Sequence, residues 1–143
     1  MAPGRAGVAH WDLHPWNVID ERARCPVVID WTATTVTDTW FDLGASLILW
    51  VSNRLPEART DHFDAYRTEA GDPIEDLDFY EAMAAMRRLF GGVVALLRGP
   101  QALGMRSEAI DDKEHLPGLV AAYRRWRELG GPAMRVVEDT MGV

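Results

Sequence analysis

The chain has 143 residues, of which 48% are hydrophobic and 26% charged, and its net charge is −7. These proportions are typical of one globular domain and exclude a disordered or fibrous chain. The negative charge argues against nucleic-acid binding through a basic surface. A single cysteine, Cys25, excludes an internal disulfide bond, and the apolar stretch "LGASLILWV" is too short to cross a membrane. We therefore expect a cytoplasmic protein.

The N-terminal part of the chain predicts a β-hairpin. Two β-rich runs, "NVID" and "PVVID", are separated by the polar stretch "ERARC", a pattern typical of antiparallel strands joined by a turn. We expect Val18 to pair with Ile29, and Ile19 with Val28. Residues 1–8 before the hairpin are expected to form a leader, and the threonine-rich stretch "TATTVTD" after it to form a loop.

Helical signals begin at Thr39. The first expected helix covers residues 39–53, and the second begins at the capping residues Thr60 and Asp61 and ends at Gly71. The acidic residues of this second helix and of the segment after it favour a solvated face. A less favoured interpretation is that they hold a cationic ligand.

Two further helices are expected. In residues 74–99, apolar side chains recur at steps of three and four and predict a buried stripe, made of Phe79, Met83, Met86, Phe90, Val93 and Leu97. The last helix is expected to run from Leu116 to Leu129, with Leu119, Tyr123 and Trp126 facing inward, and to stop at Gly130 and Gly131. The fold class is therefore mostly α with a small β-hairpin (α+β).

Polar side chains gather next to the expected hairpin. The expected register places Asn17 opposite Asp30, and the Cβ atoms of directly opposed residues lie about 4.5–5.5 Å apart. An amide oxygen and a carboxylate at that separation suit a shared Mg²⁺ ion, which also binds substrate phosphates. Asp12 precedes Asn17 in the loop that enters the hairpin. A carboxylate there can act as a base or orient an attacking hydroxyl group.

Three sequence blocks follow one another: "HWDLHPWN", "VVIDW" and "TDTWFDLG". Together they resemble the catalytic core of the aminoglycoside phosphotransferase family, which includes choline-kinase-like small-molecule kinases. The resemblance implies the C-terminal lobe of a protein-kinase-like fold over residues 1–143. Residues 8–44 would hold the catalytic loop and the metal-binding hairpin, and residues 45–143 a helical subdomain.

The same resemblance implies transfer of the γ-phosphoryl group of ATP to a hydroxyl group of a small molecule, which is cationic in the related antibiotic kinases. Asp12 would be the catalytic residue that positions this hydroxyl. Asn17 and Asp30 would bind Mg²⁺. His10 would support the catalytic loop and Asp42 would anchor it.

The N-terminal lobe of the related kinases carries a glycine-rich hairpin and a lysine that contacts the ATP phosphates. No such segment precedes the motif, and the sole lysine is Lys113. We therefore expect an isolated C-terminal lobe, whose activity alone is an open question. The missing lobe would expose an apolar face that a second copy or a partner chain could cover. Trp11 and Trp16 stand where the family commonly has glycine.

Two other functions remain open. The chain could be a non-catalytic binding or interaction module that retains the fold. Alternatively, His10, Asp12 and His14 form an "HxDxH" pattern that could hold zinc in a metal-dependent hydrolase. Zinc sites usually need three or four protein ligands, and His62 and His115 are distant in the sequence. This makes the hydrolase the least favoured of the three.

Overall fold

A computed structural model of the chain describes residues 6–20, 25–53, 55–71, 74–104 and 112–141. It contains four short strands, four helices and three short 3₁₀ turns within these ranges. The strands are β1 (Ala6–Ala9), β2 (Val18–Ile19), β3 (Val27–Val28) and β4 (Thr35–Asp38). The helices are α1 (Thr39–Ser52), α2 (Pro56–Ala70), α3 (Leu77–Arg98) and α4 (Asp112–Met141), and the turns are η1 (Pro15–Asn17), η2 (Trp31–Ala33) and η3 (Pro100–Leu103). The predicted α+β class is confirmed.

The strands form two separate two-stranded sheets, of which only one was predicted. The hairpin of β2 and β3 is present as expected. β1 also pairs antiparallel with β4, from Ala6 opposite Asp38 to Ala9 opposite Thr35. The predicted leader and the predicted threonine-rich loop are therefore wrong in part, because the two segments supply each other's hydrogen-bond partners across the intervening hairpin. Pairing between segments this far apart leaves little local signal in either one.

The predicted register of the hairpin is wrong by one residue. Val18 pairs with Val28, not with Ile29. The backbone N–H of Ile29 donates to the backbone oxygen of Asn17 at 2.9 Å, so Asn17 lies opposite Ile29 rather than Asp30. Both strands carry apolar side chains at successive positions, and the hydrophobic pattern therefore does not distinguish one register from the next.

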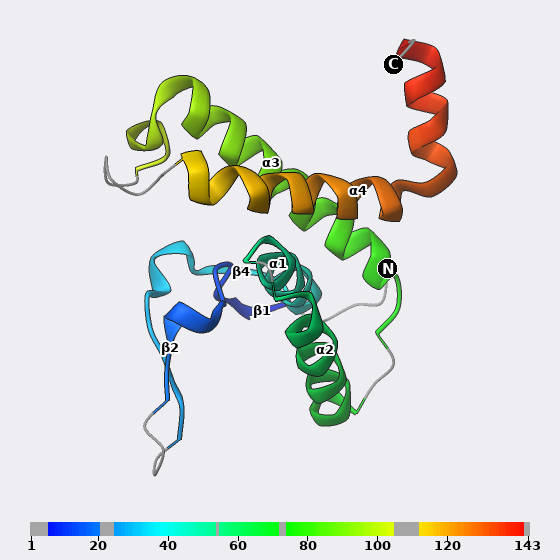
Figure 1. Ribbon diagram of the computed structural model, residues 1–143. Helices are drawn as coiled ribbons and strands as arrows, with labels where there is room; N and C mark the ends of the chain where they lie inside the picture. Colours follow the sequence, from blue (N-terminus) through cyan, green and yellow to red (C-terminus); the bar gives the residue numbers. More distant parts are fainter. Residues whose placement is uncertain (1–5, 21–24, 54, 72–73, 105–111, 142–143) are drawn as a thin grey trace.

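Helix α1 lies at the centre of the fold and contacts β1, β4 and the other three helices (Figure 1). Residues 43–49 are all buried, as expected of a helix covered on every side. Its Ala45 and Ile48 pack against Ala84 and Ala85 of α3 and Ala122 of α4. Because most of these side chains are small, the helix backbones approach one another closely.

One of these close approaches, between α1 and α3, gives a stability prediction. A Cβ atom on Gly44 would lie 2.7 Å from the backbone oxygen of Tyr80 in α3, so we expect Gly44→Ala to lower the free energy of unfolding by about 1–3 kcal/mol. On Gly91 the same atom would meet only a Leu103 methyl group, at 4.0 Å. Gly91→Ala should therefore be neutral or stabilise the protein by up to about 1 kcal/mol. Urea unfolding followed by circular dichroism measures both, and equal effects would contradict the packing described.

The apolar stripe predicted on α3 is exposed rather than buried. Phe90 is 68% exposed and Leu97 is 79% exposed. The buried residues of α3 are instead Glu81, Ala84, Ala85 and Ala95. The three-and-four periodicity correctly predicted a helix, but it did not show which face points inward, because small alanines form the contact with α1. Met83 and Met86, expected in the core, line a surface cavity.

The ends of two helices differ from those predicted. Helix α2 ends at Gly71 as predicted, but it begins at Pro56 instead of Thr60, where the fixed φ of proline suits a first helical turn. Helix α4 continues through Gly130 and Gly131 to Met141, and its C-terminal end turns away from the bundle (Figure 1). Within the part of the chain that the structure describes, every helix is too short or too polar to span a bilayer.

The inward face of α4 follows the prediction only in part. Leu119 is buried, and Trp126 packs against the core cluster. Tyr123, which was expected to face inward, is 43% exposed.

Glu81 joins three helices through a buried ion-pair cluster. Its side chain is fully buried, although the acidic segment that contains it favoured a solvated face. Arg59 of α2 donates two hydrogen bonds to its carboxylate, at 2.8 and 2.6 Å, and Arg125 of α4 donates one at 2.6 Å. Burial alone would lower the pKa of Arg125, but the hydrogen bond and charge of Glu81 raise it. Arg125 therefore stays charged at neutral pH, and the cluster ties α2 and α4 to α3.

Candidate active site

The loop between β1 and β2 is fastened to the first turn of α1 by one carboxylate. Asp42 accepts the backbone N–H of His10 on Oδ2 at 2.8 Å and that of Trp11 on Oδ1 at 2.7 Å. Hydrogen bonds from backbone N–H groups to an ionised carboxylate are shorter and stronger than those between neutral groups. Asp42 therefore fixes the position and direction of the backbone immediately before Asp12.

His10 connects the same loop to the hairpin. Its side chain is buried, its Nε2 lies 2.9 Å from the backbone oxygen of Ile29, and its Nδ1 lies 3.3 Å from the backbone N–H of Asp12. A neutral ring protonated on Nε2 donates to the Ile29 oxygen and accepts from Asp12. Both ring nitrogens are thus used inside the protein, and neither is available to zinc.

Trp11 has a backbone conformation that bulky residues rarely adopt. Its φ is +63°, in the left-handed region that costs a side chain of this kind about 1–3 kcal/mol. The Asp42 hydrogen bond contributes to holding this conformation. So does Arg87 of α3, whose guanidinium group lies 4.5 Å from the centre of the indole ring and donates to the Trp11 backbone oxygen at 3.5 Å. Strain of this kind is often found at functional sites.

Asp12, the residue after this strained position, presents its carboxylate to solvent. Its side chain is 44% exposed, and His14 Nε2 lies 3.6 Å from its Oδ2. Burial raises the pKa of Asp12, but a hydrogen bond to His14 and electrostatic interactions with His14, Arg88 and His10 outweigh burial and lower the pKa below its usual value. Asp12 is therefore ionised at neutral pH and can accept a hydrogen bond from an incoming hydroxyl group.

Asn17 is buried beside Asp12. Its Nδ2 donates to the backbone oxygen of Asp12 at 2.9 Å and lies 3.4 Å from the Asp12 carboxylate. These contacts fix the plane of the amide, and no described residue donates a hydrogen bond to its side-chain oxygen. Amide and carboxylate oxygens are the ligands that Mg²⁺ prefers, so Asn17 has the chemistry expected of a magnesium ligand.

Asp30 lies at the end of the hairpin, directly after Ile29. Its φ is +58°, and its exposed carboxylate accepts a hydrogen bond from the Thr32 hydroxyl at 2.7 Å. The backbone of Ile29 bonds to the backbone of Asn17 and to the His10 side chain. The residue immediately before Asp30 is therefore tied to the loop. The carboxylate oxygens of Asp30 also suit Mg²⁺. Among the described residues, no group of three or more His, Cys, Asp or Glu side chains could hold a metal ion. The hypothesis of a zinc-dependent hydrolase therefore gains no support.

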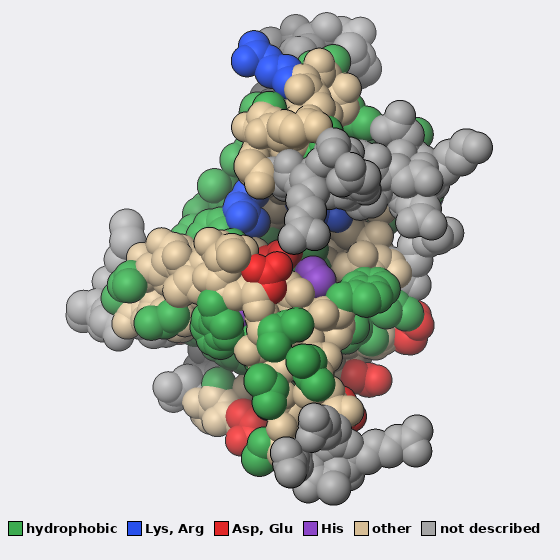
Figure 2. All heavy atoms as spheres, turned by 90° about the vertical axis from the view of Figure 1, so that its left-hand side faces the viewer, with side chains coloured by type: hydrophobic (Ala, Val, Ile, Leu, Met, Phe, Trp, Pro, Cys, Tyr) green, Lys and Arg blue, Asp and Glu red, His purple; other side chains and the backbone are tan. Residues whose placement is uncertain are grey.

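Two arginines on α3 belong to this site and were missed by the sequence analysis. Burial lowers the pKa of both Arg87 and Arg88, and the negative charge of Asp12 offsets part of this lowering. The Nε atom of Arg88 is buried and makes no hydrogen bond with the described residues. Figure 2 shows basic, acidic and histidine side chains meeting at the middle of one face. The only local signal was the pair of adjacent arginines in the otherwise apolar stretch "AMAAMRRLF".

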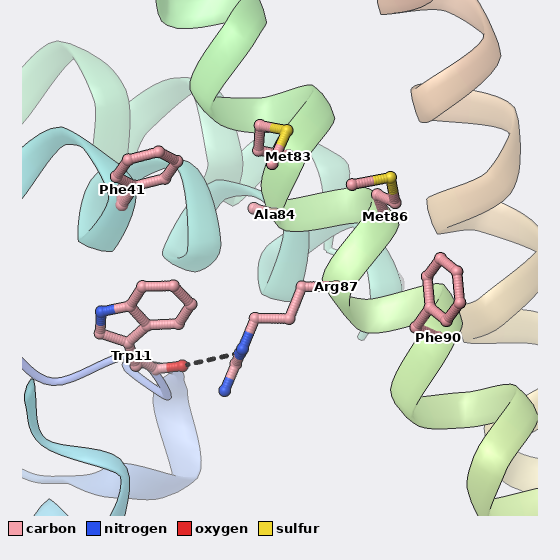
Figure 3. Close-up of a pocket in the computed structure, with 7 residues that line it drawn as sticks. All are labelled: Trp11, Phe41, Met83, Ala84, Met86, Arg87 and Phe90. Atoms are coloured by element: carbon pink, nitrogen blue, oxygen red, sulfur yellow. Dashed lines mark hydrogen bonds between the residues drawn. The ribbon is translucent and has the colours of Figure 1, made fainter.

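A cavity of about 310 Å³ opens beside the loop, between α1 and α3. Trp11 comes from the loop and Phe41 from α1, while the remaining wall is formed by α3 (Figure 3). The principal lining side chains are Trp11, Phe41, Met83, Met86, Arg87 and Phe90. Phe41 was not identified from the sequence as a candidate site residue.

The role of Asp42 gives a second prediction. Asn in its place offers one acceptor oxygen instead of two, so one of the N–H groups of His10 and Trp11 loses its partner. We expect Asp42→Asn to lower the free energy of unfolding by about 1–3 kcal/mol. Hydrogen exchange of the His10 and Trp11 amides should also become faster. NMR-detected exchange measures this directly.

Asp64→Asn is the matched control for this change. Asp64 lies on the exposed surface of α2 and pairs only with Arg67 among the described residues, at 3.2 Å. An exposed pair of this kind contributes at most about 1 kcal/mol. Unchanged exchange at His10 and Trp11 in Asp42→Asn would show that the carboxylate does not hold the loop.

The sequence profile of the phosphotransferase enzyme family matches residues 1–87, more than half of the chain. The match covers the complete loop, the hairpin, α1, α2 and the N-terminal half of α3. No curated protein and no solved structure matches the chain.

Proposed function

The chain belongs to the phosphotransferase enzyme family, and on this premise we propose that it transfers the γ-phosphoryl group of ATP to a hydroxyl group of a small molecule. The observation that carries the proposal is the pair of hydrogen bonds that the backbone N–H groups of His10 and Trp11 donate to the Asp42 carboxylate. It holds the loop so that the next residue, Asp12, presents an ionised carboxylate to solvent. Phosphoryl transfer depends chiefly on positioning and charge stabilisation.

In this proposal the chain supplies the C-terminal lobe of a protein-kinase-like fold. Residues 8–44 contribute the catalytic loop and the magnesium-binding hairpin, and residues 45–143 contribute the helical subdomain. Helix α1 spans the boundary between these two parts, so one buried helix carries Asp42 and also packs against the helices of the subdomain.

The reaction forms a bond between the acceptor oxygen and the γ-phosphorus atom. It breaks the bond from that phosphorus to the oxygen that bridges to the β-phosphate, and ADP keeps the bonding electrons. The acceptor proton passes to the Asp12 carboxylate and then to solvent. Asp12 suits this role because no described residue donates a hydrogen bond to its Oδ1, while Oδ2 lies near Asn17 and His14. A hydroxyl group can therefore approach it from solvent.

Magnesium would be held by the side-chain oxygen of Asn17 and the carboxylate of Asp30. When bound, Mg²⁺ supplies positive charge that neutralises the phosphates during transfer. The Nδ2 hydrogen bond to Asp12 supports this role, because it fixes the orientation of the Asn17 oxygen. His10 positions the loop against the hairpin and does not contact substrate.

Isothermal titration of the chain with ATP, with and without Mg²⁺, tests the proposal. We expect saturable binding that requires Mg²⁺ and that Asp30→Asn weakens by at least about tenfold. Asp64→Asn on the surface of α2 is the control and should bind like the unaltered chain. The absence of binding at millimolar ATP would refute the enzyme proposal for this chain and favour a non-catalytic module of the same fold.

A further inference from the structure

The cavity beside the catalytic loop has walls suited to a flat, apolar molecule. Trp11, Phe41 and Phe90 supply three aromatic rings, and Met83 and Met86 supply adaptable thioether side chains (Figure 3). The rings of Trp11 and Phe41 are stacked at 6.3 Å with an interplanar angle of 21°. The volume of about 310 Å³ lies at the lower end of the range of about 300–1,000 Å³ found for small-molecule sites.

The one charged side chain among the described residues that line this cavity is basic, although the chain as a whole is acidic. Arg87 lies between Trp11 and the rest of the α3 wall (Figure 3) and forms no salt bridge within the described ranges. The next residue, Arg88, adds a second positive charge close to Asp12. The buried acidic residue of the same helix, Glu81, is already paired with Arg59 and Arg125. A cationic ligand would therefore be repelled by Arg87, because no carboxylate lines the described part of the wall and the nearby Asp12 carboxylate already interacts with both arginines.

The backbone strain at Trp11 points to a role for its side chain. At a φ of +63° glycine carries no steric penalty, whereas tryptophan costs about 1–3 kcal/mol. What the indole ring adds at this position is a wall of the cavity and a surface for the Arg87 guanidinium group. Because Trp11 directly precedes Asp12, a ring that packs on the indole lies next to the proposed catalytic carboxylate.

We propose that this cavity binds the ring of the phosphoryl acceptor, and that the acceptor is a hydroxylated aromatic compound that is neutral or anionic, not cationic. Trp11, Phe41 and Phe90 hold the ring, and Arg87 selects against positive charge. The assignment of the bound molecule as acceptor rests on the proposed phosphotransferase function. Binding of the ring itself rests only on the cavity.

Three compounds with the same phenol ring and different charge test the proposal: para-hydroxyphenylacetate is anionic, tyrosol neutral and tyramine cationic. Their binding to the full chain is measured by NMR titration without ATP. We expect the anionic and neutral compounds to bind and to shift the signals of Met83 and Phe90. We expect tyramine to bind at least about tenfold more weakly. Equal or tighter binding of tyramine, or no binding of any of the three at millimolar concentration, would overturn the proposal.

Three variants identify the site of binding. Trp11→Gly relieves the strained backbone and removes the indole wall, so it should stay folded and lose affinity for all three compounds. Phe90→Ala changes a residue that is 68% exposed and should weaken binding even if Trp11→Gly fails to fold. Arg87→Gln should abolish the preference against tyramine. Binding that is unaffected by either wall variant would contradict the assignment of the cavity.

The outcomes separate this inference from the proposed function, because these titrations contain no nucleotide. Binding in the expected order without any phosphoryl transfer would leave the cavity assignment standing and refute the kinase. Phosphoryl transfer to other hydroxyl compounds, without binding of the phenols, would refute the cavity assignment alone.

Discussion

Replacing Glu81 by alanine should lower the free energy of unfolding by about 3–5 kcal/mol. The carboxylate is fully buried and receives hydrogen bonds from Arg59 on α2 and Arg125 on α4. Its loss leaves two partly buried guanidinium groups without their shared counter-ion. It also removes the only ion-pair connection among the described residues that joins these two helices to α3. Chemical denaturation followed by circular dichroism measures the change.

Glu128→Gln is the matched control, because Glu128 also pairs with Arg125, at 3.3 Å, but its side chain is 65% exposed. An exposed pair contributes at most about 1 kcal/mol, so this variant should be close to the unaltered chain. If Glu81→Ala destabilises the protein no more than Glu128→Gln does, then Glu81 does not hold the helices together.

Replacing Asp12 by asparagine should reduce the rate of phosphoryl transfer by about 10²–10⁴-fold and leave the fold intact. Asparagine has nearly the same shape but cannot accept the proton of the acceptor hydroxyl. Because Asp12 is 44% exposed, its replacement should change stability little. The initial rate of ADP formation in the presence of a hydroxyl acceptor measures the effect, and the melting temperature shows that the variant is folded.

The pH dependence of that rate follows from the lowered pKa of Asp12. A carboxyl group whose pKa is lower in the folded state than in the unfolded state is ionised in both states when the pH is above both pKa values. In that pH range its charged form stabilises the fold. That stabilisation, and the base itself, are lost as pH falls through the folded-state pKa, which lies below the usual value of an aspartate side chain. The unaltered chain should therefore show no loss of rate from Asp12 protonation near neutral pH. A rate that Asp12→Asn leaves unchanged would contradict the role of this residue.

Those candidate site residues that lie close together in the sequence could be identified from the sequence alone. His10, Asp12 and Asn17 share one short loop, and a recognisable spacing links them to Asp42 at the start of the next helix. The sequence did not show how Asp42 acts. The structure shows that its two carboxylate oxygens accept the backbone N–H groups of His10 and Trp11, one each.

Features that depend on contacts between distant segments were predicted less well. The pairing of β1 with β4 was missed, because neither strand has a strong pattern by itself. The register of the hairpin was wrong, because two short apolar strands fit equally well when shifted by one residue. On α3, the alanine face is buried against α1 and the larger apolar face is exposed. Arg87 and Arg88 come to the site only through this orientation of α3.

Phosphorus NMR of the chain mixed with Mg²⁺, ATP and a set of hydroxyl compounds is the most direct test of the Asp12 loop as a phosphotransfer site. The set should contain sugars, amino alcohols and phenols, so that the result does not depend on one choice of acceptor. We expect ADP signals together with a new phosphomonoester signal, both lost in Asp12→Asn. Unchanged ATP signals with every compound, or the same product from Asp12→Asn, would contradict this expectation.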